Sequence, residues 1–147
     1  MSRLLLLDAS VFIDTFDPAS ENHRSSVDLL QNLRRRAQLV SMPAHGWFEV
    51  QCTLRRLRSE GRFVGPIFDG RMEYELRLIH LDEPFIQKYA PIEIPHLKAG
   101  DHIYVVVAKA NDATLVTNDK KMRAVAIEVG VHALSSADLN STLEIVV

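Results

Sequence analysis

The feature that most constrains this chain is a run of four leucines near its start, which ends at an acid. Residues 4–7 carry no polar alternation, as expected of a strand that is buried on both faces of a parallel sheet. Asp8 follows directly, and Ser10 can cap the short helix expected over residues 10–16. Open α/β sheets bind ligands at the carboxyl ends of their strands. Asp8 is therefore either a ligand-binding acid or a simple helix cap, and this segment alone leaves both interpretations open.

Strand and helix patterns alternate along the rest of the chain. Further strands are expected over residues 39–42, 75–81, 113–119 and 131–134, and further helices over residues 23–36, 44–60, 84–89, 101–110, 120–129 and 135–140. This alternation predicts an α/β fold, a three-layer α/β/α sandwich with a mostly parallel central sheet and right-handed crossovers. Residues 1–147 are expected to form a single domain. Residues 63–74, which contain Gly-Pro and Asp-Gly turn signals, receive no assignment.

Composition restricts the class of function. A formal net charge of −2 argues against a generally basic nucleic-acid-binding protein, although it leaves local patches open. Cys52 is the single cysteine, so neither a disulfide framework nor a cysteine metal cluster is expected, and a reducing cytoplasm fits. No apolar run approaches the roughly 20 residues of a membrane span, so no membrane association is expected.

Four acids are expected to meet at one edge of the sheet. Asp8 and Asp119 each end a strand, whereas Glu49 and Asp101 lie near the starts of helices. Carboxylates that are brought together repel one another unless cations join them, and hard oxygen ligands suit Mg²⁺ or Mn²⁺. The pattern predicts a site in which two metal ions activate a water and stabilise the leaving oxygen of a phosphodiester.

Three polar residues beside these acids have a predicted supporting role. Hydroxyl and amide groups next to a metal site orient its ligands or bind metal-bound water. The residues in question are Ser10, Thr117 and Asn118.

Two of the acids also have simpler structural interpretations. Glu49 suits an exposed flank or an internal salt bridge, and Asp101 suits a favourable charge at a helix N-terminus. The histidines are scattered, and His102 is of interest because it follows Asp101. A receiver-like phosphoacceptor is disfavoured, since Ala9 stands where a second acid is needed and no lysine ends the last strand.

Two arginine clusters are candidate RNA-binding surfaces. One closes the helix of residues 23–36, and the other lies at the distal end of the helix of residues 44–60. Such cations complement a helix dipole and aid solubility, or they contact phosphates, and the sequence leaves both interpretations open. The arginines considered for RNA binding are Arg34, Arg35, Arg36, Arg55 and Arg56.

Together these motifs resemble the PIN-domain family, and the chain length resembles that of its VapC-type toxins of toxin–antitoxin pairs. The matching segments are Leu-Leu-Leu-Asp8-Ala-Ser10-Val-Phe-Ile-Asp14, Trp-Phe-Glu49-Val, Asp101-His-Ile and Leu-Val-Thr117-Asn118-Asp119. The resemblance spans nearly the whole chain and implies a PIN-like nuclease domain with Mg²⁺-dependent endoribonuclease activity.

By the same resemblance, the catalytic acids and metal ligands are Asp8, Glu49, Asp101 and Asp119, and Ser10 and Thr117 are supporting hydroxyls. The family also implies an RNA substrate, a homodimer and inhibition by a cognate antitoxin. The alternative is a non-catalytic RNA- or protein-binding module on the same fold, which would explain the arginines but gives no reason for all four acids.

Overall fold

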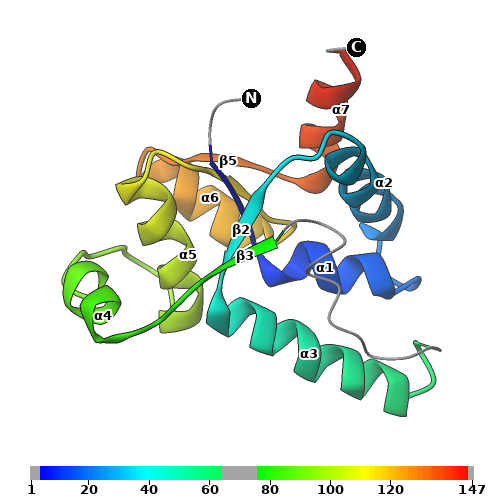
Figure 1. The fold of residues 1–147 in the computed structure, drawn as a ribbon, viewed down its shortest axis with the longest axis horizontal. Coiled ribbons are helices and arrows are strands. Elements are labelled where there is room, and N and C mark those ends of the chain that lie inside the picture. The colour runs from blue at the N-terminus through cyan, green and yellow to red at the C-terminus, as the bar shows by residue number, and fades with distance from the viewer. Residues whose placement is uncertain (1–3, 64–75, 146–147) are drawn as a thin grey trace.

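The centre of the computed structural model is a five-stranded sheet with the order β3-β2-β1-β4-β5 (Figure 1). The structure describes residues 4–63 and 76–145. All four strand pairings are parallel, which confirms the α/β fold predicted from the alternation of strands and helices. The strands are β1 (Leu5–Leu7), β2 (Val40–Pro43), β3 (Leu76–Ile79), β4 (Thr114–Val116) and β5 (His132–Leu134).

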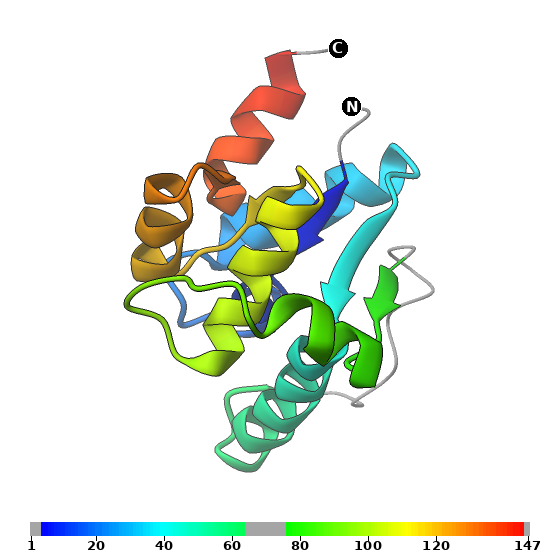
Figure 2. The same ribbon diagram turned by 90° about the vertical axis from the view of Figure 1, so that its left-hand side faces the viewer.

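Helices form a layer on each face of this sheet, as Figures 1 and 2 show. On one side lie α4 (Glu83–Tyr89), α5 (Ala99–Ala110) and α6 (Lys120–Glu128). On the other lie α1 (Ala9–Phe16), α2 (His23–Arg35) and α7 (Ser136–Ile145), with α3 (Ala44–Ser59) packed against α1. Among the described residues, no helix combines the length and apolarity needed to cross a membrane.

Strand β1 occupies the middle of the sheet, between β2 and β4. Leu5 pairs with Val40 on one side and with Thr114 on the other. All three leucines of β1 have an exposed fraction of 0%, which confirms the prediction of a strand buried on both faces. The main-chain N–H of Asp8 donates to the carbonyl of Val116 at 2.9 Å, so the pairing of β1 with β4 continues as far as the acid.

Helix α3 buries one narrow stripe of its surface. Its buried positions follow one another at intervals of four, four and three residues, which is the spacing of one helix face; they are Gly46, Val50, Leu54 and Leu57. Phe48 lies on the other side of the helix and is 73% exposed, so this apolar side chain is not part of the core. Trp47 packs edge-on against Phe12, with the ring centroids 5.6 Å apart.

Several element ends differ from their predicted positions. Strand β2 begins at Val40, because Leu39 is 42% exposed and lies before the strand. Helix α5 begins at Ala99, which makes Asp101 its third residue. Helix α7 runs to Ile145, beyond the predicted residue 140, because Leu139 and Leu143 are buried one turn apart on its inner face.

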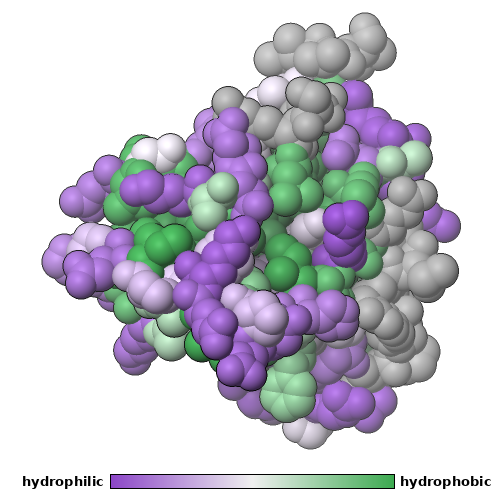
Figure 3. Space-filling model, turned by 60° about the vertical axis from the view of Figure 1, so that its left-hand side comes forward, coloured by the Kyte–Doolittle hydropathy of each residue, from purple (hydrophilic) through white to green (hydrophobic). Residues whose placement is uncertain are grey.

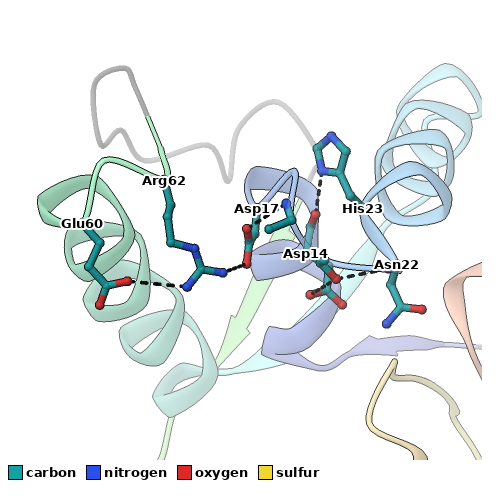
Figure 4. Close-up of polar contacts among 8 residues, drawn as sticks. Asp14, Asp17, Asn22, His23, Glu60 and Arg62 are labelled. Carbon is teal, nitrogen blue, oxygen red and sulfur yellow. Dashed lines mark hydrogen bonds and ion pairs between the residues drawn. The ribbon is translucent and has the colours of Figure 1, made fainter.

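The end of α3 is tied to the end of α1. Gly61 adopts a φ of +72°, and the N–H of Arg62 donates to the carbonyl of Leu57 at 2.9 Å, as in a glycine-terminated helix. This turn directs Arg62 toward Asp17, with Nη2 2.6 Å from Oδ2 (Figure 4). Residues 64–75, with most of the unassigned segment and its turn signals, lie outside the described residues.

Candidate active site

The four acids are distributed around the point where the strand order reverses direction. From β1 the chain proceeds to β2 on one side, whereas from β4 it proceeds to β5 on the other. The loops that follow β1 and β4 therefore separate at the carboxyl edge of the sheet, where open α/β sheets bind their ligands. Asp8 directly follows β1, and Asp119 lies three residues after the end of β4.

Asp8 is a buried carboxylate held by two hydroxyl groups. Its exposed fraction is 4%. The Ser10 and Thr117 hydroxyls both donate to its Oδ2 atom, each at 2.7 Å. Asp8 precedes α1, but its side chain accepts no capping hydrogen bond from that helix. The helix-cap interpretation of Asp8 thus finds no support, whereas its two bonds hold the carboxylate in one orientation.

The environment of Asp8 favours its protonated form. Burial raises the pKa of Asp8 from 3.8 to about 6, and the charges of Glu49 and Asp101 contribute in the same direction. The hydrogen bonds from Thr117 and Ser10 act against this rise, because they stabilise the charged carboxylate. The ionised site therefore stores unfavourable energy that a cation would relieve.

Glu49 and Asp101 are electrostatically coupled to Asp8 and to each other. Burial raises the pKa of Glu49, and the charge of Asp101 raises it further. The pKa of Asp101 is raised by burial and then by the charge of Asp119. Asp8, Glu49 and Asp101 are each affected by the charge of another acid, and Asp119 is the acid that acts on Asp101, which links the four in a single electrostatic cluster.

Asp119 and two lysines lie beside this cluster. Asp119 is exposed and caps α6, since its Oδ1 accepts from the N–H of Met122 at 3.0 Å. Its own N–H donates to the Thr117 hydroxyl at 3.0 Å, so Thr117 connects Asp8 to Asp119. The charges of Lys121 and Lys98 lower the pKa of Asp101. Both lysines therefore lie near the acids. Neither lysine was among the site residues predicted from the sequence.

The chemistry of this donor set fits a divalent cation. Within the described residues, none of the four carboxylates forms a salt bridge. In the same part of the chain, no three His, Cys, Asp or Glu side chains already stand close enough to enclose a metal ion. Mg²⁺ commonly keeps several waters and binds through one or two carboxylates together with substrate phosphates. The arrangement therefore suits an open Mg²⁺ or Mn²⁺ site better than an all-protein cage.

A buried phenol supports the loop that carries Asp8. Tyr104 is 1% exposed, and its hydroxyl accepts a hydrogen bond from the N–H of Ala9 at 3.3 Å. Gly46 provides space for this ring, since a Cβ atom at position 46 would overlap the Tyr104 hydroxyl. This pair is not evident from the sequence pattern, although a glycine inside a helix is a recognisable sign of close approach.

Two further predicted residues have their polar atoms engaged elsewhere. The side chain of Asn118 bonds to Asp14, Ser26 and Ser136. None of these residues is one of the four acids of the predicted metal site. His102 Nε2 lies 2.8 Å from the carbonyl of Ile92. The predicted role of Asn118 in binding metal-bound water is thus not supported by its hydrogen bonds.

The arginine clusters lie on different parts of the molecule. The first lies at the end of α2, just before β2 begins, and therefore at the amino edge of the sheet, opposite the acids. There Arg36 Nη2 donates to the carbonyl of Leu143 at 2.7 Å, and Arg35 donates to Asn32. Arg55 and Arg56 are exposed in the second half of α3. Their role in RNA binding remains a prediction.

Comparisons with known proteins agree with this fold. A family model described as "PIN domain" matches residues 5–128. The crystal structure of PAE2754 from Pyrobaculum aerophilum is similar with a TM-score of 0.68 and 14% identity, covering 99% of this chain and 92% of that one. At that identity the likeness concerns the fold alone. No curated protein matches the sequence.

The contact between Gly46 and Tyr104 yields a first prediction. In Gly46→Ala, the new methyl group meets the Tyr104 hydroxyl and lies 3.0 Å from Met42 Cγ. Overpacking of this kind costs about 1–3 kcal/mol, so urea unfolding should show a loss of that size.

The matched test adds Tyr104→Phe, which removes the overlapping oxygen. In a double-mutant cycle, the Gly46→Ala change should cost less in the Tyr104→Phe background than in the parent. Equal costs in both backgrounds would show that the hydroxyl does not occupy the space above Gly46.

The buried carboxylate yields a prediction about pH. Because the pKa of Asp8 is 3.8 in the unfolded chain and about 6 in the folded protein, the folded form binds more protons between these values. The stability of the metal-free protein should therefore fall as pH rises from about 4 to 6, by on the order of 3 kcal/mol, and then level off. Urea unfolding in EDTA across this range measures the effect.

Asp8→Asn is the control for this measurement, because it lacks the titrating group and keeps nearly the same shape. Subtracting its profile from that of the parent removes the contribution of other titrating residues. A difference that is flat, or that rises with pH, would contradict the burial of an ionisable Asp8.

Proposed function

The chain belongs to the PIN domain family, and from this premise we propose that it is a metal-dependent endoribonuclease, the toxin of a toxin–antitoxin pair. PIN domains are typically nucleases, and the hard oxygen donors of this site suit the divalent metal that such nucleases use. The observation that carries the proposal is the coupled cluster of carboxylates at the carboxyl edge of the sheet. Glu49 and Asp101 both raise the pKa of Asp8, although none of these acids has a salt-bridge partner among the described residues.

Each acid has a distinct part in the proposed site. Asp8 would supply the fixed ligand, because the Ser10 and Thr117 hydroxyls hold its carboxylate. Asp101, in the first turn of α5, and Asp119, the cap of α6, would supply further ligands, together with Glu49 on α3. Mg²⁺ or Mn²⁺, when bound, supplies Lewis acidity for the phosphate and activates water as the nucleophile. The protein's own contribution is to hold the carboxylates and to prevent them from turning into other orientations.

The proposed substrate, RNA, is supported by cations beside the acids. Lys98 and Lys121 both affect the pKa of Asp101, so their ammonium groups lie within electrostatic reach of the site. Lysines at the rim of an acidic cluster attract phosphates that the carboxylates alone would repel. A non-catalytic RNA- or protein-binding module is the competing function, and an RNA cleavage assay decides between the two.

We also propose that the protein forms a homodimer, as its family resemblance implies. An apolar cleft of about 340 Å³ lies between α4 and α5, and its lining includes Phe85, Ile86 and Val106. Figure 3, which brings this side of the molecule forward, shows apolar side chains exposed among hydrophilic ones. Exposed apolar patches often mark protein contacts, which supports an interface here.

The cognate antitoxin is part of the same proposal and would place a basic side chain against the acids.

The proposed dimer can be tested at Ile86, which lines the cleft and is 56% exposed. Ile86→Glu should lower the mass measured by light scattering from that of two chains to that of one. The matched control is Ile127→Glu, because Ile127 is equally exposed, at 57%, on α6. A monomeric parent, or a variant that stays dimeric, would contradict this interface.

The proposed activity is tested by incubating labelled single-stranded RNA with the protein in Mg²⁺, in Mn²⁺ and in EDTA. Cleavage should require the metal and should fall by orders of magnitude in Asp101→Asn, which loses one ligand. In EDTA this variant should melt at a higher temperature than the parent, because it relieves repulsion within the acidic cluster.

Asp112→Asn is the matched control, since Asp112 is exposed just beyond the far end of α5. It should leave both cleavage and melting close to those of the parent. If Asp101 only complements the helix dipole, its variant should instead melt lower, by roughly 0.3–1 kcal/mol of stability, and should still cut RNA. Undiminished cleavage in EDTA would disprove the metal dependence, and no cleavage of any RNA would favour the binding module.

A further inference from the structure

The loop after β4 is anchored from behind by the side chain of Asn118. Its Nδ2 atom donates to Asp14 Oδ2 and to Ser26 Oγ, both at 2.9 Å. Its Oδ1 atom accepts from the Ser136 hydroxyl at 2.8 Å and from the Ser136 N–H at 3.1 Å. Because a main-chain N–H can only donate, the atom that faces it is the amide oxygen. All four hydrogen-bonding positions of this side chain are therefore used.

These partners belong to three different helices. Asp14 lies on α1, Ser26 on α2 and Ser136 at the start of α7, and both serines are 0% exposed. Asp14 is itself held in place, because Ser20 donates to its Oδ1 at 2.9 Å and His23 Nδ1 lies 2.9 Å from its carbonyl oxygen (Figure 4). The amide of Asn118 thus connects the β4 loop to three helices through buried or partly buried contacts.

The main chain of Asn118 reaches the acids from the opposite direction. Its N–H donates to the Ser10 hydroxyl at 3.1 Å, and that hydroxyl donates to Asp8. The residues on either side of Asn118 are Thr117, which also bonds to Asp8, and the acid Asp119. A displacement of Asn118 would therefore move both hydroxyl donors of Asp8 and the position of Asp119 together.

We propose that Asn118 is a positioning residue, which fixes the metal-binding acids through Ser10 and Thr117, and that α7 is part of the support of the active site. The inference rests on the proposed nuclease function. It also extends the functional unit beyond residue 128, where the family match ends, because Ser136 supplies half of the hydrogen bonds of the Asn118 side chain.

Asn140 offers a control of the same chemistry within the same helix pair. It is 7% exposed, and its Nδ2 atom donates to the carbonyl of Ser25 at 2.7 Å. Its Oδ1 atom accepts from Asn32 Nδ2 at 3.0 Å. Asn140 therefore joins α7 to α2, as Asn118 does, but none of its bonds reaches the β4 loop.

The first experiment compares Asn118→Ala with Asn140→Ala. Both should melt at lower temperatures than the parent, because each removes buried hydrogen bonds. Only Asn118→Ala should weaken Mn²⁺ binding, measured by electron paramagnetic resonance, and lower kcat, each by roughly 10–100-fold, with KM for RNA changing little. Equal Mn²⁺ affinities and equal kcat values in the two variants would show that Asn118 is only structural, and would overturn the proposal.

A rescue experiment guards against simple misfolding. Asn118→Asp places two carboxylates in contact and should impair both Mn²⁺ binding and kcat. The exchange variant Asp14→Asn/Asn118→Asp has the net charge of the parent and reverses the direction of one hydrogen bond, since the amide at position 14 now donates to the carboxylate at position 118. It should recover most of the lost Mn²⁺ affinity and kcat, whereas no recovery would contradict the proposed network.

Mn²⁺ binding separates this proposal from the nuclease function itself. If the parent cuts no RNA, but the variants still rank as expected in Mn²⁺ affinity, the nuclease proposal fails and the positioning role of Asn118 stands. If the parent cuts RNA, but Asn118→Ala binds Mn²⁺ and turns over as Asn140→Ala does, the positioning role fails and the nuclease proposal stands.

Discussion

The burial of the Asp8 carboxylate is the constraint on which the rest of this structure depends. A buried charge is costly unless hydrogen bonds or a cation compensate it, and here two hydroxyls compensate it in part. One hydroxyl belongs to Ser10, in the first turn of α1, and the other to Thr117, directly after β4. The two strands must therefore be neighbours in register, as the pairing of Leu7 with Val116 shows.

The elements around Asp8 are arranged so that its position cannot easily change. Tyr104 bonds to the N–H of Ala9 on one side, and it reaches that position because Gly46 leaves room for the ring. On the other side, Asn118 ties the β4 loop to three helices. A functional site held by helices and strands keeps its geometry better than one held by loops alone. Pre-organisation of this kind is what a carboxylate needs in order to bind a metal in one orientation.

The sequence was sufficient to predict that β1 is a buried strand followed directly by an acid, because a four-leucine run with no polar alternation has few alternatives to a buried parallel strand. Strand and helix order also determine the edge of the sheet at which each acid emerges, which is the reason for expecting the four acids together. Side-chain direction was harder to predict. Phe48 is as apolar as Trp47 in the sequence, and only the helix phase set by Gly46 and Val50 shows that Phe48 is exposed. The partners of Asn118 lie up to 104 residues away, so nothing in its local sequence reveals that its amide faces the helices.

The most direct test of a single metal site at this edge of the sheet is a crystal structure of the protein grown with Mn²⁺, with anomalous diffraction used to locate the metal. We expect a peak within coordination distance of the Asp8 carboxylate, with Asp101 or Asp119 bound directly or through a water. A peak at a site remote from Asp8, or no peak at a Mn²⁺ concentration that supports RNA cleavage, would contradict the assignment of these acids to one metal centre.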